Sequence, residues 1–229
     1  MDNPHPTTTI KVELHCHTYY SKDSLMEPQR LIQICEQRGI DRVAITDHNE
    51  IRGALEAAEI DPDRVIVGEE VKTTQGEFVA YFVKECVPSG LSPMEAIELL
   101  RDQGAFISVA HPFDTLRSGS WDKGDLEHIV PHVDAIEVFN ARNWTSSTNS
   151  TAETYAKENE LPGIAGSDAH AYLEVGRVTM IMPDFNNREG FRRALHTSRI
   201  VGGRSIFLVH LLSRYASLRK SLGWRPRGS

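Results

Sequence analysis

Histidine and carboxylate side chains recur in closely spaced groups along this 229-residue chain. His15 and His17 stand two positions apart. Asp168 and His170 repeat that spacing near the other end of the chain. Imidazole and carboxylate ligands without thiolate suit Zn²⁺, Mn²⁺ or Fe, and a set this rich in nitrogen does not suit Ca²⁺. The residue types therefore predict a centre for divalent metal ions.

The elements that must position these groups alternate between strand-like and helix-like segments. We predict strands over residues 10–14, 42–46, 65–67, 77–83, 105–110, 135–139, 163–166 and 178–182. We predict helices over 28–38, 51–60, 93–103, 151–160 and 188–196. This alternation is typical of an α/β fold with a mainly parallel sheet, either open or closed into a barrel. No linker or internal repeat interrupts it, so we expect a single domain over 1–229.

Both architectures place chemistry at the carboxyl ends of their strands. Those ends here supply His15, His17, His48, Glu69, Glu70, His111, Asn140, Asp168 and His170. Residues two apart on an extended chain face the same way, so each spaced pair converges on one side. About eight ligands exceed the three or four that one catalytic zinc uses, which indicates two or three ions. Clustered ions suit phosphoryl chemistry.

Together, these motifs resemble the polymerase-and-histidinol-phosphatase (PHP) family. The segments concerned, within residues 13–170, are His15-Cys16-His17-Thr18-Tyr19-Tyr20-Ser21, Ile45-Thr46-Asp47-His48, Gly68-Glu69-Glu70-Val71, Ala110-His111-Pro112 and Gly166-Ser167-Asp168-Ala169-His170. The resemblance implies a distorted (β/α)7 TIM-like barrel with a cleft for up to three metals. Stand-alone phosphatases of the family look more similar than its polymerase-attached members.

Carried over by position, the resemblance assigns the metal ligands His15, His17, Asp23, His48, Glu70, His111, Asp168 and His170. The first ion would take His15, His17, Glu70 and Asp168. Glu70 would bridge to a second ion on His111, and Asp23, His48 and His170 would hold the third. The family pattern Gly-x-Glu selects Glu70 over Glu69, whereas strand parity says only that the two face opposite ways.

This chain departs from the family pattern twice. Many members carry a further histidine after the strand that ends here at Phe139, where this sequence offers Asn140 and Arg142. Some carry one in the strand over 77–83, where we find Val79. The second ion is therefore the least supported, and two metals are an alternative to three.

The expected function is hydrolysis of a phosphate ester by metal-bound hydroxide, with Mn, Zn or Fe as cofactor and Mg as a further candidate. Asp168, His111 and His170 are the expected catalytic residues, and either histidine would help protonate the leaving oxygen. The substrate would be a nucleotide or another small phosphomonoester, with nucleic acid only as a short oligonucleotide. Two alternatives stay open: an amidohydrolase, and a metal-stabilised binding domain without turnover.

Other residues carry weaker predictions. Asn140, Arg142 and Arg177 are candidates for binding a substrate phosphate, the alternative being surface ion pairs for the arginines. A basic, acid-free helix is predicted over about 205–223, with apolar residues at helical spacing. We expect it to pack on the barrel with a solvated basic face, or else to serve as a platform for nucleic acid, a partner or an anionic membrane.

Composition and charge set the remaining limits. The net charge of −7 argues against a general nucleic-acid surface, and three scattered cysteines favour a reducing compartment. No apolar run approaches the ~20 residues of a membrane span, and the first six residues lack signal-peptide features. The expectation is therefore a cytoplasmic protein, and its oligomeric state is open.

Overall fold

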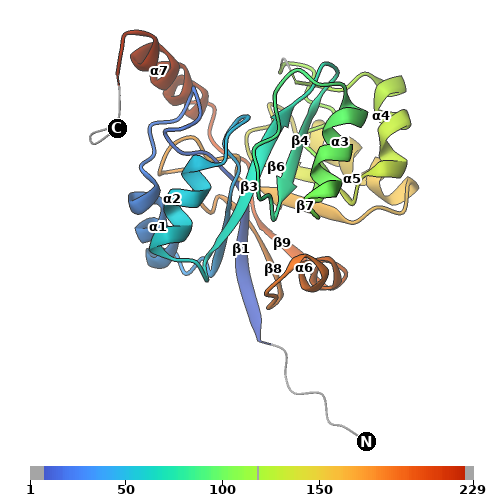
Figure 1. The fold of residues 1–229 in the computed structure, drawn as a ribbon, viewed down its shortest axis with the longest axis horizontal. Helices are drawn as coiled ribbons and strands as arrows, with labels where there is room; N and C mark the ends of the chain where they lie inside the picture. The colour runs from blue at the N-terminus through green and yellow to red at the C-terminus, as the bar shows by residue number, and fades with distance from the viewer. Residues whose placement is uncertain (1–7, 118, 225–229) are drawn as a thin grey trace, which may run out of the picture.

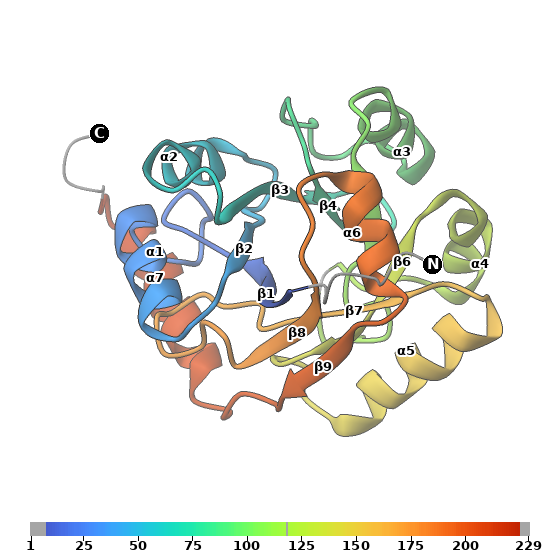
Figure 2. The ribbon, with the colours of Figure 1, turned by 90° about the horizontal axis from the view of Figure 1, so that it is seen from below.

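The computed structural model describes residues 8–117 and 119–224, which are arranged around one curled sheet (Figures 1 and 2). The strands are β1 (Thr9–Cys16), β2 (Arg42–Ile45), β3 (Val65–Lys72), β4 (Glu77–Tyr81), β5 (Phe106–Val109), β6 (Ala135–Asn140), β7 (Gly163–Gly166), β8 (Val178–Pro183) and β9 (Arg199–Gly202). The helices are α1 (Pro28–Gln37), α2 (Arg52–Ile60), α3 (Pro93–Asp102), α4 (Lys123–Ile129), the 3-10 turn η1 (Val130–His132), α5 (Ser146–Glu158), α6 (Arg188–Leu195) and α7 (Val209–Ser221). The predicted α/β barrel is confirmed, as a nearly closed barrel of nine strands in place of seven.

Strand direction explains why the barrel is distorted. The sheet order is β7-β6-β5-β4-β3-β2-β1-β8-β9. Neighbours are parallel from β1 to β3 and from β5 to β7, but β4 runs antiparallel to both of its neighbours. A turn over residues 73–76 joins β3 to β4, and such a short connection permits only an antiparallel hairpin. The carboxyl ends of six parallel strands therefore share one end of the barrel with the amino end of β4.

The barrel closes where β7 meets β1. The Ala169 N–H donates to the His15 carbonyl at 3.1 Å, and the His17 N–H donates to the Ala169 carbonyl at 2.9 Å. This approach requires glycine at position 166, because a Cβ there would lie 2.4 Å from the His15 Cβ. The first and last histidine motifs are thereby held side by side.

The opposite end of the barrel is filled by apolar side chains. Phe191 of α6 is fully buried and makes edge contacts with Tyr81 and Phe106, at centroid distances of 5.6 and 5.0 Å. Figure 2 shows α6 lying across this end, while α1 to α5 surround the sheet. The interior thus leaves only the carboxyl end for polar chemistry.

Several predicted boundaries shift. α5 begins at Ser146 rather than at 151, because Thr145 caps it by accepting from the Thr148 N–H within a run of serine and threonine that disguises the helix start. The prediction missed β9, whose four residues are all exposed, and α4. The helix capped by Ser92 begins where predicted, with both hydrogen bonds of a capping box.

The predicted C-terminal helix forms as α7, but it turns its apolar residues outward. Val209 and Ala216 are its buried residues, whereas Leu211 and Leu218 are about half exposed. Arg225 and Arg227 of the predicted basic segment lie outside the described residues. Within the described part of the chain, no helix is both long and apolar enough to cross a bilayer.

Candidate metal centre

The structure brings all eight predicted ligands together at the carboxyl end of the barrel. They come from the ends of, or the loops after, β1, β2, β3, β5 and β7: His15, His17, Asp23, His48, Glu70, His111, Asp168 and His170. Asp23 and His48 are partly exposed, and the other six are buried. The parity argument explains the pairing, because both histidines of the first motif reach the same carboxylate.

The carboxylate of Glu70 is the middle of this cluster. Its Oε1 lies 2.8 Å from His111 Nε2, and its Oε2 lies 2.9 Å from His48 Nδ1. The same Oε2 is 3.4 Å from His17 Nε2 and 3.5 Å from His15 Nε2. Burial raises the pKa of Glu70, but His48 and His15 outweigh it and hold that pKa well below its ordinary value. Glu70 is therefore a carboxylate shared by four imidazoles, as a bridging ligand must be.

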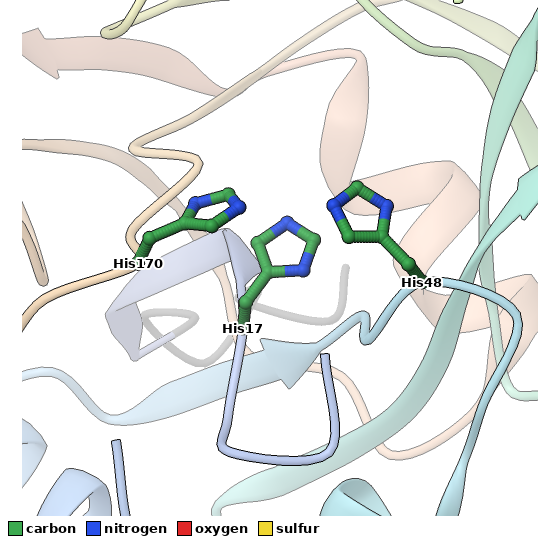
Figure 3. A group of neighbouring side chains, drawn as sticks. All are labelled: His17, His48 and His170. Carbon is green, nitrogen blue, oxygen red and sulfur yellow. The ribbon is translucent and has the colours of Figure 1, made fainter. Parts of the chain in front are cut away.

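A second group opens toward the cavity. Figure 3 shows the rings of His17, His48 and His170 gathered together from three separate segments, with ligand nitrogens that lie within 4.8 Å of one another. Asp23 reaches the same group, with its Oδ2 3.4 Å from His170 Nε2 and its Oδ1 3.5 Å from His48 Nε2. Burial and the two neighbouring imidazoles hold the pKa of His17 well below its ordinary value, so its ring is neutral.

Several of these polar atoms are buried without a hydrogen-bond partner. They are His15 Nε2, His17 Nε2, Asp23 Oδ1, Glu70 Oε2 and Asp168 Oδ1. Buried polar atoms are normally paired, and leaving one unpaired costs about 1–3 kcal/mol. All five belong to predicted ligands, and each lies 3.3–3.8 Å from another ligand atom of the cluster. The donor set therefore fits divalent cations.

Glu77 is a ligand candidate that sequence reasoning missed. Its Oε2 lies 3.6 Å from His111 Nε2, and with Glu70 these residues form a third group of possible ligands. Glu77 stands at the amino end of β4, and because β4 is antiparallel, that end meets the carboxyl ends of its neighbours. The rule that ligands follow parallel strands could not find it.

A layer of buried side chains holds the ligands in place. Glu137 of β6 accepts the His111 N–H at 2.8 Å, and its other oxygen lies 2.9 Å from His15 Nδ1. Asn140, predicted to bind substrate, instead donates to Glu137 and Asp168, each at 3.1 Å. Such partners fix which ring nitrogen of a histidine faces the metal. Sequence reasoning missed Glu137, whose only signal was an acidic residue inside an otherwise apolar strand.

Replacing Glu137 by glutamine is expected to weaken metal binding by about 10–100-fold without unfolding the protein. The amide keeps the shape but removes the charge that orients His15 and polarises its ring. Titration of the metal-free variant by calorimetry measures the effect, with Glu153→Gln on the exposed face of α5 as the matched control. Equal affinities for the two variants would show that Glu137 serves folding alone.

A cavity of about 420 Å³ opens above the ligands. Its lining includes Asp23, His48, Glu77 and His170, together with the cations Lys22, Arg117, Arg142 and Arg214. Helix α7 closes one side with His210, whose ring stacks on Trp144 at 4.3 Å. Burial, with the nearby guanidinium groups, lowers the pKa of His210 to about 4, so this wall is neutral.

The predicted phosphate-binding arginines fare differently. Arg142 is buried in the cavity wall and donates to Ser213 Oγ of α7 at 2.8 Å. Arg177 is exposed, does not line the cavity, and donates to the Arg204 carbonyl at 2.9 Å, so its predicted place at the site is wrong. Arg117 takes that place: it donates to Asp168 and, at 3.0 Å, to Asp114.

Comparison with known proteins places this centre in a family. The model described as PHP domain matches residues 13–111, and the model described as PHP-associated matches residues 146–200. An uncharacterized protein of Methanocaldococcus jannaschii, MJ1587, is 36% identical over 157 residues, which are 62% of this chain and 89% of that protein. The chain belongs to the PHP family. A second M. jannaschii protein, the uncharacterized MJ0417, is 35% identical over 180 residues, covering 77% of this chain and 72% of its own.

Solved structures share the PHP fold. A two-domain protein from Bacteroides vulgatus, described as containing a predicted PHP-like metal-dependent phosphoesterase, superposes with a TM-score of 0.69 at 21% identity. The match covers 86% of this chain and 65% of that protein, so this chain spans less than two thirds of it. A putative metal-dependent phosphoesterase from Bifidobacterium adolescentis gives 0.62 at 16% identity, over 81% of this chain and 95% of its own. PHP membership and the clustered ligands support the enzyme class expected from the sequence, a metal-dependent hydrolase.

Proposed function

We propose that this PHP protein hydrolyses a small phosphate ester with two or three divalent cations, Mn, Zn or Fe. The observation that carries the proposal is the cavity itself, where a floor of imidazoles and carboxylates faces a wall of guanidinium groups. Bound cations in such a site lower the pKa of a water and stabilise charge on a phosphate. Guanidinium groups suit the remaining phosphate oxygens, because they present several donors in one plane.

The three ligand groups suggest how the cations would be shared. His15, His17 and Glu70 form the innermost group, and Asp168 lies 3.3 Å from His17. Glu70, Glu77 and His111 form the second group, in which Glu77 supplies a donor that compensates for the histidine replaced at Asn140. The third group, His17, His48 and His170, adds Asp23. Glu70 and His17 each belong to two groups, which favours closely spaced ions.

His170 is the better placed of the two proposed proton donors. It lines the cavity, whereas His111 lies beneath it with its Nε2 directed at Glu70. The His170 Nδ1 lies 2.9 Å from the Asp168 carbonyl oxygen, a contact that fixes the ring by donating to that oxygen. His170 can therefore present Nε2 to the cavity and give a proton to the leaving oxygen.

The test is a phosphate-release screen of the metal-supplied protein over nucleotides, nucleoside bisphosphates, sugar phosphates and short oligonucleotides. We expect release from at least one class, loss of release in excess EDTA, and recovery with Mn²⁺ or Zn²⁺. Parallel assays with amides and lactones test the amidohydrolase alternative. Full turnover of a phosphomonoester in excess EDTA contradicts the proposal, and a folded, metal-loaded protein without any turnover favours a binding domain.

A further inference from the structure

The outer face of α7 and the residues just before it form an exposed apolar surface. This surface, the α7 patch, consists of Ile206, Phe207, Leu208, Leu211, Leu212, Tyr215, Leu218 and Leu222. Each side chain leaves between 37% and 78% of its surface exposed. Eight of the fifteen exposed large apolar side chains in the described chain thus lie within seventeen consecutive residues. Such a concentration marks an interaction surface rather than scattered exposure.

The way in which α7 is attached leaves this surface unused by its own barrel. Its inner face is made of small or polar groups: Ala216 is buried, Ser213 accepts from Arg142, and Lys220 donates to the carbonyls of Tyr19 and Ser21. Leu218 stands two residues after Ala216, which is about 200° around a helix. The leucines therefore point away from the barrel, which reverses the usual orientation of an amphipathic helix.

The spacing within the α7 patch is that of a helix-pairing seam. Leu208, Leu211, Tyr215, Leu218 and Leu222 follow one another at intervals of three, four, three and four residues. This repeat places one narrow apolar line along the helix and is typical of helices that pack side by side. An interfacial membrane helix needs no such repeat.

We propose that the α7 patch is the interface of a two-fold homodimer, in which α7 packs antiparallel against α7 of a second copy. The seam is self-complementary about its centre: Leu208 faces Leu222 of the partner subunit, Leu211 faces Leu218 of the partner subunit, and Tyr215 meets its own counterpart. A parallel pair would set Arg214 against Arg219 of the partner subunit, and this repulsion favours the antiparallel arrangement.

The size of the surface matches such a dimer. With roughly 200 Å² for each large apolar residue, the α7 patch presents on the order of 800 Å², which is what one partner contributes to a standard interface. It also exceeds the roughly 300–600 Å² of the largest apolar patch on a typical monomer. Arg219 already lies over the Tyr215 ring at 5.9 Å, so its stem extends the apolar surface.

Light scattering on the full chain tests the proposal. The wild type should have twice the 25.7 kDa mass of one chain, and Leu211→Glu/Leu218→Glu should have the mass of one. The matched control is Leu55→Glu/Leu99→Glu, which changes equally exposed leucines on α2 and α3 and should stay dimeric. Circular dichroism checks folding, and Leu211→Ser/Leu218→Ser replaces the first variant if it does not fold.

Cross-linking tests the antiparallel arrangement. In a Cys86→Ser background, which removes the exposed native thiol, Tyr215→Cys should form a disulfide-linked dimer on mild oxidation. Ser217→Cys, on another face of the helix, should not. A monomeric wild type overturns the proposal, including one that instead sediments with phosphatidylserine vesicles or binds an acidic helix. A double variant that remains dimeric overturns it too.

Discussion

Replacing Glu70 by glutamine is expected to abolish turnover and to release metal, while the barrel stays folded. Glu70 contacts four imidazoles, and its Oε2 has no hydrogen-bond partner. Glutamine keeps the volume but replaces one oxygen by an amide nitrogen, which cannot bind a cation, and removes the negative charge. Loss of several kcal/mol of charge stabilisation corresponds to a fall in kcat on the order of a thousandfold.

The chain provides its own control at the preceding position. Glu69 is equally buried, but it points to the other side of β3, where it accepts the Val87 N–H at 3.0 Å. Burial raises the pKa of Glu69 to about 7, so glutamine resembles the protonated form that is already populated near neutral pH. Glu69→Gln should therefore keep metal content and kcat near wild-type values. Equal losses in both variants would point to damage of β3 rather than to loss of a ligand.

The sequence predicts much of this site because parallel strands impose a common geometry. Strand ends that follow helical crossovers must meet at one end of the barrel, so motifs more than 150 residues apart, such as those at His15 and Asp168, converge. Period-two alternation then settles which neighbours face inward. These arguments need no contact information, which is why the predicted ligands and the observed cluster agree so closely.

Residues that escape this geometry could not be predicted. Glu77 begins an antiparallel strand, Glu137 stands inside a strand, and Arg117 is delivered by a loop whose path depends on tertiary contacts. The orientation of α7 was hidden for a related reason. Helical periodicity identifies the apolar face, but whether that face meets the barrel is decided by partners elsewhere in the chain, such as Arg142 for Ser213.

The last prediction concerns His48, the ligand that is most exposed among the imidazoles of the site, with 19% of its side chain accessible. His48→Ala should cost one ion for each chain, because its ring joins Glu70 to Asp23 at 2.9 and 3.5 Å. Turnover should then fall by about a hundredfold or more, as expected when a catalytic cation is lost. The fold should survive, since the side chain faces the cavity rather than the core.

An alternative role for His48 is to brace its loop. Backbone contacts hold that loop independently, because the His48 N–H donates to Ser21 Oγ at 3.1 Å and the Asn49 N–H donates to the Glu70 carbonyl at 2.9 Å. A purely bracing side chain would therefore contribute only about 0.5–1.5 kcal/mol to the free energy of unfolding. Elemental analysis of wild type, His48→Ala and the control His128→Ala, an exposed histidine on α4, separates the two roles. If His48→Ala matched His128→Ala in metal content and turnover, His48 would not be a ligand, and the third group would be left without one of its three imidazoles.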